Sequence, residues 1–585
     1  MTDSPFLRSY RKKEEEASDI RKQIISACYN HGGHLSSNLG TVELAESIVS
    51  SFDCLKDDVL FDVGHQSYAY KILTGRDLSL LRETNGLSPF TLRKESPYDK
   101  YDNGHSGDAI STGIGMALAK KLNHDDSYTI VIVGDASFKN GLAKEGLDVL
   151  ENRVDLKNFI LVINKNGMAI SKENDDESLN DDFIREERVS SRLSHIDEYK
   201  DEESYLKHVK EIREESMNDH TYSGLDYLGK VEGHDYYALM EAFETAKKDA
   251  KRHPVIFEVL TRKGYGMKEA EEDRIGFYHG VNPKFLKDDL SLEYTYHKEN
   301  VLLSMMKEDK DLFVLTPAMI TSSSLWRVFE TYPERTLDVG IAEEAALTIA
   351  SGLALKGKKP IVDIYSTFLQ RAIDQVIMNI SRQELSCLFL LERCSLVPGD
   401  GSSHHGLFDV ALLKGIPNVR IYMAYDKYSL EYLMKNKGFE EKKAVFIRVP
   451  KEKMIKTDAL KEYQDINFFK KENNDTLVLT LGQDGYEVID SLKDENLDTA
   501  LLLSLLDFDI SSFLSYQNII FYDGYGVKEG TACYLEEKLL ENGYKGSFHS
   551  ITMEKRYYPF GKVDDIKKQE RIDKESVLKF ISDHR

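Results

Sequence analysis

The sequence predicts an α/β fold in which three doubly wound α/β domains follow one another along the chain. The chain has 585 residues, a length at which three or four domains are the natural expectation. Short apolar runs alternate with amphipathic segments, as in a largely parallel sheet covered by helices on both faces. The alternation breaks twice, near 285–295 and 452–474. We therefore expect domains at residues 1–290, 295–455 and 470–585.

The first predicted domain contains the apolar strands TIVIVGD, FILVIN and VIFEVL, separated by amphipathic helices. A polar stretch at about 171–221, rich in Asp, Glu, Lys and Ser, interrupts this domain. Only a weak helical pattern, around Tyr205, Val209 and Ile212, occurs inside the stretch. Such a composition favours a mobile surface excursion.

The second predicted domain begins near Tyr294 and continues to about Pro450. Its strand-like runs are LFVLTPA, TLDVGI, PIVDIYS, LSCLFLLE, VRIYMA and AVFIRVP. The third domain is shorter and contains TLVLTLG and IIFYDGYG. The chain has no repeat of short period, so the pattern is that of α/β domains in series.

Composition narrows the function classes. The chain carries 77 basic and 100 acidic residues, a net charge of −23, which argues against nonspecific nucleic-acid binding. An anionic substrate would need a local basic pocket. The start MTDSPFLRSYRKKEEE lacks the apolar core of a signal peptide, and no apolar run reaches the length of a membrane-spanning helix. The five cysteines form no C-x-x-C pair, so we expect reduced, buried thiols in a cytoplasmic protein.

The stretch Val131–Met168 is the most informative part of the chain. One apolar strand leads into Gly134-Asp135-Ala136-Ser137, and a second leads into Asn164-Lys165-Asn166-Gly167-Met168. Ligands of parallel sheets lie beyond the carboxyl ends of the strands, and Mg²⁺ prefers oxygen ligands such as a carboxylate and an amide. A predicted helix from Gly141 to Leu150 would direct its N-terminus at phosphates. The stretch therefore predicts a magnesium diphosphate site.

The spacing of the two polar residues supports this interpretation. Asp135 and Asn166 are 31 residues apart, close to the spacing in the thiamine diphosphate motif, which is G-D-G followed after some thirty residues by N. Gly-Asp and Asn-Gly pairs are also common in ordinary turns. Taken alone, the motif leaves a plain strand-turn-helix as an equal alternative.

Seven further segments decide between these alternatives. They are HGGHLSSNLGTVELAESI, FDVGHQSYAYKILTGR, YDNGHSGDAISTGIGMALA, TRKGYG, DVGIAEEAALTIASGLA, IYSTFLQRAIDQV and GDGSSHHGLFDVALL. Together they resemble the 1-deoxy-D-xylulose-5-phosphate synthase family of thiamine diphosphate enzymes, in the transketolase group. The resemblance covers all three domains in order, and it implies a homodimer. It also implies that the first domain holds the diphosphate of the cofactor and the second holds its aminopyrimidine.

The resemblance implies a role for each matching residue. Cofactor-binding residues would be His65, Gly104, His105, Ser106, Asp135, Ala136, Ser137, Asn166, Met168, Lys263, Glu343 and Phe368, with Asp135, Asn166 and Met168 as metal ligands. Substrate-binding residues would be His34, His279, Tyr365, Arg371, Arg393, Asp400, His404 and Lys451, and catalytic residues would be Glu343, His34, His65 and His404. Mg²⁺ would accompany thiamine diphosphate.

Glu343 has the central role in this scheme. By itself it would be a glutamate favoured in a first helical turn by the helix dipole. In the family, the matching glutamate bonds the aminopyrimidine and promotes removal of the thiazolium C2 proton. A carboxyl group in an apolar pocket stays protonated enough to share that proton.

The histidines fall in loops flanked by Gly or Ser, where a lone histidine is usually a solvated turn residue. The resemblance instead implies proton transfer near the reacting carbonyls for His34, His65 and His404, and a substrate-side position for His279. A zinc site is not expected, because the histidines lack paired ligand spacing.

The matching residues of the second domain also have simpler interpretations. Tyr365, Phe368 and Arg371 could be core residues at a strand end, and Asp400 a turn residue. The resemblance implies that Phe368 stacks on the aminopyrimidine and that Asp400 bonds a substrate hydroxyl. Lys263, otherwise a solvated strand-end lysine, would contact the diphosphate.

The sequence departs from the family pattern at several positions. Glu392-Arg393 replaces D-R, and Lys451 replaces an arginine, which keeps the charge but loses the planar fork that grips phosphate. Ala136 replaces the second glycine of G-D-G, at a cost of roughly 1–2 kcal/mol if its φ were positive. After Glu343, Glu-Ala stands where the family has Gln-His.

The expected reaction joins pyruvate to D-glyceraldehyde 3-phosphate with loss of CO₂. The product, 1-deoxy-D-xylulose 5-phosphate, would feed isoprenoid, thiamine and pyridoxal phosphate synthesis. Two alternatives stay open at this point. Lys451 is compatible with a transketolase-like enzyme for another donor or acceptor, and Ala136 and Ala345 with an inactive paralogue that binds cofactor or partners.

Overall fold

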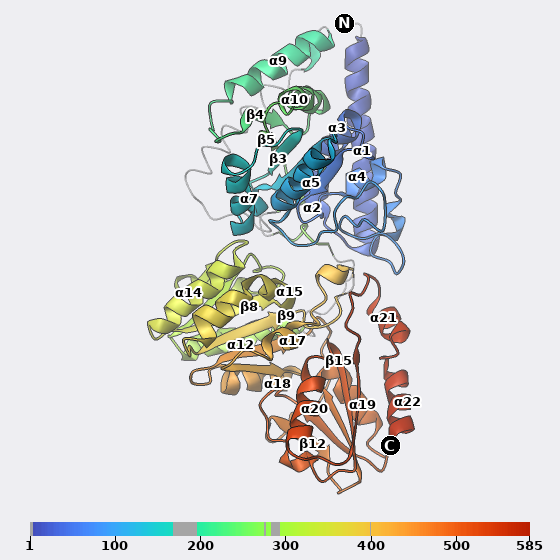
Figure 1. Cartoon of the computed structure of the whole chain (residues 1–585), viewed down its shortest axis with the longest axis vertical. Coiled ribbons are helices and arrows are strands. Elements are labelled where there is room, and N and C mark those ends of the chain that lie inside the picture. Colours follow the sequence, from blue (N-terminus) through green and yellow to red (C-terminus); the bar gives the residue numbers. More distant parts are fainter. Residues whose placement is uncertain (1–3, 168–195, 200, 274–275, 282–292, 398) are drawn as a thin grey trace. The chain divides into compact units, whose positions relative to one another are not determined.

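A computed structural model describes residues 4–167, 196–199, 201–273, 276–281, 293–397 and 399–585 (Figure 1). The chain divides into two compact units, Met1–Lys287 and Asp288–Arg585. The first unit contains one β-sheet, and the second contains two.

The sheet of the first unit is parallel throughout and has the strand order β1-β2-β3-β5-β4. Its strands are β1 (Asp58–Phe61), β2 (Thr129–Gly134), β3 (Phe159–Lys165), β4 (Asp226–Glu232) and β5 (Val255–Leu260). Alternate side chains of β2 enter different cores, since Ile130 and Ile132 belong to one cluster while Val131 and Val133 belong to another. A strand buried on both faces explains why these segments are continuously apolar.

Helices supply the other side of each core. They are α1 (Pro5–His31), α2 (Leu35–Leu39), α3 (Val42–Ser51), α4 (Tyr68–Leu73), α5 (Ala109–Asn123), α6 (Asp135–Phe138), α7 (Gly141–Asn152), α9 (Glu202–Glu215), α10 (Tyr236–Asp249) and α11 (Lys268–Glu271), with short 3₁₀ turns η1 (Leu78–Leu80) and η2 (Ile196–Glu198). The predicted helix after Gly141 is α7, which Asn140 caps by accepting a hydrogen bond from the Leu142 amide.

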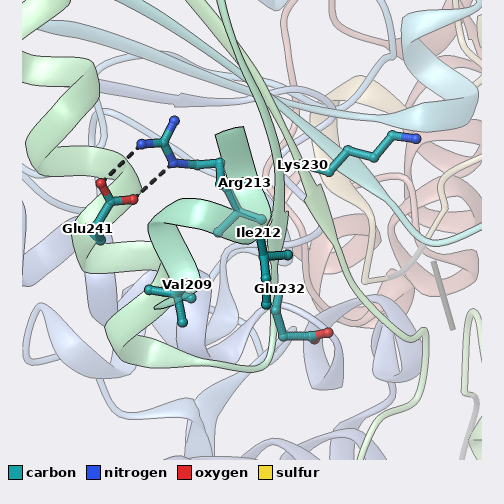
Figure 2. A pocket seen from close by; sticks show the side chains of 8 residues that line it. Val209, Ile212, Arg213, Lys230, Glu232 and Glu241 are labelled. Atoms are coloured by element: carbon teal, nitrogen blue, oxygen red, sulfur yellow. Dashed lines mark hydrogen bonds and ion pairs between the residues drawn. The ribbon is translucent and has the colours of Figure 1, made fainter. Parts of the chain in front are cut away.

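The polar stretch at 171–221 is only partly an excursion. Residues 168–195 lie outside the described residues. Glu202–Glu215 forms α9, where the sequence shows only a weak helical pattern. Its weak apolar stripe is real packing, because Tyr205, Val209 and Ile212 are buried. Figure 2 shows the small hollow between α9, β4 and α10, where Arg213 forms two hydrogen bonds of 2.9 and 3.0 Å with Glu241.

The larger sheet of the second unit is also parallel, with strand order β10-β11-β9-β8-β6-β7. Its strands are β6 (Leu312–Thr316), β7 (Thr336–Asp338), β8 (Lys359–Tyr365), β9 (Cys387–Glu392), β10 (Val419–Met423) and β11 (Ala444–Val449). The associated helices are α12 (Tyr294–Glu308), α13 (Trp326–Thr331), η4 (Pro333–Arg335), α14 (Glu343–Leu355), α15 (Ser366–Leu369), η5 (Gln370–Ala372), α16 (Ile373–Gln375), the π-helix η6 (Val376–Ser381), η7 (Gly401–Ser403), α17 (Asp409–Leu413), α18 (Lys427–Tyr432) and the π-helix η8 (Leu433–Lys437).

The last sheet is mixed and has the order β12-β14-β13-β15-β16, with β12 antiparallel to β14. Its strands are β12 (Ile466–Lys470), β13 (Thr476–Leu481), β14 (Asp498–Leu502), β15 (Asn518–Val527) and β16 (Ser547–Met553). The helices are α19 (Gly482–Ser491), η9 (Ser511–Phe513), α20 (Thr531–Glu541), α21 (Val563–Gln569) and α22 (Lys574–His584). Strand β12 lies in the stretch 452–474, where the pattern predicts a linker.

The predicted fold class, three α/β sheets in series, is confirmed. All five cysteines are free thiols; Cys28, Cys54, Cys387 and Cys394 are buried, while Cys533 is half-buried. Among the described residues, no helix has both the length and the apolar character needed to cross a membrane.

Candidate active site

The ends of β2 and β3 bring the two motif residues together. The strands are in parallel register, with Gly134 opposite Asn164, so the residues that follow them share one edge of the sheet. The Asp135 Oδ2 atom accepts hydrogen bonds from the backbone amides of Asn166 at 2.9 Å and Gly167 at 2.8 Å. The carboxylate is thus fixed by the neighbouring strand end. Met168, the third predicted ligand, lies outside the described residues.

Ala136 causes no backbone strain in this turn. It lies in α6 and is absent from the residues with positive φ, so the conditional cost of replacing glycine does not arise. Its amide donates to Asp135 Oδ1 at 2.8 Å. Ser137, the next predicted cofactor residue, is buried in the same short helix.

The turn Gly104-His105-Ser106 is held by a residue that motif analysis missed. The carboxylate of Asp62 accepts hydrogen bonds from the Gly107 amide at 2.9 and 3.0 Å and from the Ala109 amide at 3.3 Å. Burial raises the pKa of Asp62 to about 6. Gly107 has φ +94°, and a Cβ there would lie 2.5 Å from Asn140 Oδ1. This close approach explains the glycine after Ser106.

Three predicted histidines of the first unit form one cluster. The ring centroids of His34 and His65 are 5.4 Å apart, and that of His279 lies 5.7 Å from each. Burial, together with the nearby charge of Lys263, lowers the pKa of His65 to about 3. Burial also holds the pKa of His279 well below its ordinary value. Both rings are therefore neutral at pH 7, a state in which imidazole carries one hydrogen-bond donor and one acceptor.

Lys263 links the histidine cluster to the strand ends. Its side chain follows β5, and the residue is only 6% exposed. Burial lowers its pKa to about 8, while the charges of Asp135 and Asp273 oppose that shift. The same lysine lowers the pKa of His65 and His279. Lys263 thus supplies a buried cation between the carboxylate of Asp135 and the imidazoles.

Glu343 occupies the first position of α14 in the second unit and is 4% exposed. Burial raises its pKa, and the Arg371 guanidinium, whose Nη1 lies 3.4 Å from Glu343 Oε2, acts against that shift. The predicted pairing of a buried acid with a helix N-terminus is therefore present. The ion pair with Arg371 was not predicted.

A row of aromatic rings follows β8. The rings of Tyr365 and Phe368 are 5.0 Å apart, and those of Phe368 and His404 are 5.6 Å apart. The Arg393 guanidinium lies 4.0 Å from the centre of the Tyr365 ring, and its Nη1 lies 3.2 Å from Asp400 Oδ2. The strand ends of β8 and β9 thus bring five predicted residues of this unit into one group, namely Tyr365, Phe368, Arg393, Asp400 and His404.

Lys451 lies at the same sheet edge as Arg393. Val449, the last residue of β11, pairs with Glu392, the last residue of β9. The backbone amide of Lys451 donates to Ser395 Oγ at 3.4 Å, and the residue is exposed. Its neighbour Glu452 accepts a hydrogen bond of 2.9 Å from the Tyr525 hydroxyl, which ties this edge to the last sheet.

A buried ion triad supports the same strand ends. Lys298 of α12 forms ion pairs with Asp363 of β8 and Glu392 of β9, and all three side chains are at most 2% exposed. Burial alone would lower the pKa of Lys298, but the two carboxylates outweigh it and raise the pKa. A single lysine within a helix carries no sequence signal for such a role. Of the three residues of the triad, only Glu392 drew attention in the sequence, because it replaces the aspartate of the family pattern.

No group of three or more His, Cys, Asp or Glu residues with metal-site geometry occurs within the described ranges. The Asp135 carboxylate and the side-chain amide oxygen of Asn166 form a smaller set of ligands. Such a set can suffice, because Mg²⁺ needs few protein ligands when phosphate oxygens fill its other positions.

Comparison with known proteins gives the family of the chain. The family model for 1-deoxy-D-xylulose-5-phosphate synthase matches residues 7–261. A synthase of that name from Thermus thermophilus is 33% identical, over 97% of this chain and 94% of its own length. The chain belongs to the 1-deoxy-D-xylulose-5-phosphate synthase family. Another relative of that name, from Bacillus cereus, is 37% identical over 73% of this chain and 71% of its own length.

Membership of the synthase family brings the cofactor class with it. The family model for the transketolase pyrimidine-binding domain matches residues 291–456, which implies thiamine diphosphate. A solved transketolase from Campylobacter jejuni matches 97% of this chain and 99% of its own at 14% identity, with a TM-score of 0.42. That likeness is too low to add to the family assignment.

Proposed function

We propose that the protein condenses pyruvate with D-glyceraldehyde 3-phosphate, releases CO₂ and forms 1-deoxy-D-xylulose 5-phosphate. Family membership over 97% of the chain is the observation that carries this proposal. The side chains of each unit support it: the first unit provides an oxygen donor set and neutral imidazoles, and the second provides a buried acid and guanidinium groups. A reaction between two anionic substrates needs groups that bind metal, transfer protons and bind phosphate, and these side chains can do so.

The first unit suits a magnesium diphosphate. Asp135 and the Asn166 amide offer the oxygen ligands that Mg²⁺ prefers, and Lys263 offers a cation for the diphosphate oxygens. The Nδ1 atom of His65 is buried and has no hydrogen-bond partner among the described residues. A buried polar atom without a partner costs free energy, so a ligand that bonds it is favoured. The Gly104-His105-Ser106 turn would contact the same group.

Bound thiamine diphosphate would supply a carbon nucleophile and accept the electrons released with CO₂. Phe368 would pack against the aminopyrimidine face. The Glu343 carboxyl, with its pKa raised by burial, would hold a proton on Oε and share it with a ring nitrogen of the cofactor. A carboxyl group whose pKa is raised towards the working pH is better suited to general acid–base catalysis than one at its ordinary value.

The imidazoles would move protons at the substrates. His34, His65 and His404 would donate to or accept from the carbonyl oxygens, and His279 would contact substrate. Burial keeps His65 and His279 neutral, so they can act without carrying a fixed charge.

The second unit would bind the acceptor sugar phosphate. Arg393 can hold phosphate oxygens through two parallel hydrogen bonds, and Lys451 would add a second cation. Asp400 would accept a hydrogen bond from a substrate hydroxyl. Tyr365 and Arg371 would complete the lining, with Arg371 also restraining Glu343.

A homodimer is part of the proposal. In the second unit, α14 exposes Ile349, and the π-helix η6, which packs against α14, exposes Ile377 and Met378; the three are 38 to 42% exposed. Neighbouring apolar side chains of this kind are typical of surfaces that a second copy covers.

Product analysis tests the proposal directly. Purified protein would be incubated with pyruvate and glyceraldehyde 3-phosphate, with and without Mg²⁺ and thiamine diphosphate, alongside Glu343→Ala. The expected result is CO₂ release that requires the acceptor, the cofactor and the metal. CO₂ release with a different acceptor would favour the transketolase-like alternative, which the Lys451 departure motivates. Cofactor binding without any CO₂ release would favour an inactive paralogue.

A further inference from the structure

His234 is a half-buried side chain outside the predicted site, and it contacts the loop that carries Lys263. Its Nε2 atom accepts a hydrogen bond of 2.7 Å from the Arg262 backbone amide. Its ring is stacked on that of Tyr265, with centroids 3.7 Å apart and an angle of 16° between the planes. His234 therefore contacts Arg262 and Tyr265, the two residues that flank the pair Lys263-Gly264.

The remaining contacts of His234 fix its orientation. Since Nε2 accepts a hydrogen bond, the ring proton of the neutral form is on Nδ1. Nδ1 lies 3.4 Å from Glu43 Oε2. A carboxylate on one ring nitrogen determines which nitrogen acts as the acceptor, and it also fixes the plane of the ring.

Glu43 is in turn held by Arg21. The Arg21 Nη2 atom lies 2.7 and 2.6 Å from the two carboxylate oxygens of Glu43, and both side chains are below 10% exposed. Burial would raise the pKa of Glu43, but His234 and Arg21 outweigh it and lower the pKa. The Arg21 guanidinium also lies 4.7 Å from the centre of the Tyr265 ring. A continuous series of contacts thus connects Tyr265 of this loop to His234, Glu43 and Arg21.

Backbone hydrogen bonds also restrain the loop: the Thr261 amide donates to the Lys165 carbonyl at 2.8 Å, and the Tyr265 amide donates to the Arg262 carbonyl at 3.1 Å. The Gly264 amide donates to the Ser36 carbonyl at 2.8 Å, and Gly40 packs against the Arg262 carbonyl so closely that a Cβ would lie 2.8 Å from that oxygen. The side chain of Arg262 is largely exposed, and its ion pair with Glu271, at 3.6 Å, is long. The Arg262 backbone takes part in two of these hydrogen bonds. The one that its amide donates to His234, at 2.7 Å, is shorter than the one that its carbonyl accepts from the Tyr265 amide, at 3.1 Å.

We propose that His234 is a positioning residue, which holds the Arg262 amide and thereby fixes Lys263 for contact with the diphosphate of the cofactor. The inference rests on the proposed function for its last step, because Lys263 is a proposed diphosphate contact. Its first step, the restraint on the loop, stands on the geometry of the protein alone. The two steps can be measured separately.

Two amide substitutions separate the hydrogen bond from the stacking. His234→Gln places an amide near the position of Nε2 and keeps an acceptor for Arg262, whereas His234→Asn is too short to reach it. Both remove the ring stacked on Tyr265, so only the acceptor differs between them. His253→Asn, at an exposed histidine, is the matched control.

The first measurement is hydrogen exchange at the Arg262 amide in the cofactor-free, full-length protein. A hydrogen bond of this kind contributes about 1 kcal/mol, so His234→Asn should speed exchange about fivefold, while His234→Gln and His253→Asn stay within about twofold of wild type. The second measurement is calorimetric titration with thiamine diphosphate and Mg²⁺. The dissociation constant should rise about fivefold for His234→Asn and recover in His234→Gln.

The outcomes are distinguishable. Unchanged exchange at Arg262 in a folded His234→Asn protein would overturn the inference, whatever the cofactor does. Faster exchange with an unchanged dissociation constant would overturn the link from the loop to Lys263. A wild-type protein that binds no thiamine diphosphate would overturn the proposed function instead, and the exchange result would still decide whether His234 holds the loop.

Discussion

The Arg371 guanidinium lies 3.4 Å from the Glu343 carboxylate, at the buried first turn of α14. Burial favours the neutral acid, and the cation favours the anion. The protonation state of Glu343 is thus set by a balance between two opposed effects. An acid held in this way is suited to sharing a proton, and the predictions begin with it.

Glu343→Gln should lower kcat by about 10²- to 10⁴-fold, the usual contribution of one general acid or base. Glutamine keeps the shape and part of the hydrogen bonding, so thiamine diphosphate should still bind. Steady-state kinetics with calorimetric titration would measure both effects. Glu344→Gln, one residue along the same helix, is the control and should stay within about threefold. A Glu343→Gln enzyme with near-normal kcat would remove the proposed acid.

Arg371→Met should shift the pH dependence of kcat. Removing the cation leaves burial unopposed, so the pKa of Glu343 rises further. If the protonated acid is the working form, activity falls as pH rises through that pKa, and the alkaline fall should move to higher pH. Profiles of kcat against pH for both proteins would measure the shift. A fall displaced to lower pH would contradict the assigned direction.

Lys263→Met should stabilise the cofactor-free protein at pH 7, by up to about 3 kcal/mol, because burial lowers the pKa of Lys263 to about 8 from 10.5. Between these values the unfolded chain binds more protons than the folded one, so wild-type stability rises with pH. The advantage of the variant should be complete below pH 8 and vanish towards pH 10.5. Melting temperatures would follow it, with Lys268→Met, an exposed lysine, as control.

The same substitution should weaken thiamine diphosphate binding, since it removes the proposed diphosphate cation. Greater stability with poorer binding is the combination expected of a functional buried lysine. A variant that melts lower than wild type at pH 7 would show that Lys263 is a structural residue.

Lys451→Arg should lower KM for glyceraldehyde 3-phosphate several-fold. The guanidinium restores a planar fork that binds phosphate through two bonds, which an ammonium cannot do. The residue is exposed at the edge shared with Arg393, so the larger group has room. Kinetics with phosphorylated and unphosphorylated glyceraldehyde would isolate the effect, and equal changes for both acceptors would exclude a phosphate contact.

Lys298→Met should destabilise the second unit by about 3–5 kcal/mol, because it leaves two buried carboxylates without their cation. Lys307→Met, on an exposed face of the same helix, should have little effect. Adding Asp363→Asn and Glu392→Gln to Lys298→Met should restore much of the loss. Thermal melts of the four proteins would measure these differences, and an unchanged single variant would contradict the triad.

The parts of the site that follow strand ends could be predicted from the sequence. Asp135 and Asn166 each come directly after a buried strand, and the carboxyl ends of neighbouring parallel strands meet at one edge. The position of Glu343 at a helix start also follows from the local pattern, whereas its catalytic role was implied only by the family resemblance. These positions could be predicted because the alternation of apolar and polar residues marks where strands end and helices begin.

The supports of the site could not be predicted, because they depend on contacts across long sequence separations. Lys298 pairs with carboxylates 65 and 94 residues away, and His234 contacts Glu43 from 191 residues away. A lysine in a helix is normally expected to have a solvent-exposed side chain, so the burial of Lys298 could not be foreseen. Helix α9 showed only a weak pattern for a related reason, since its apolar stripe is short and its charged face dominates the composition.

Anchoring of α9 has a consequence for the evolution of this chain. Tyr205 and Tyr10 both donate hydrogen bonds to the buried carboxylate of Asp235, so the chain rejoins the first sheet at a fixed point after leaving it at β3. One carboxylate thus serves two tyrosine hydroxyls, from α1 and from α9. Relatives that keep α9 in this place should therefore keep Asp235 together with both tyrosines.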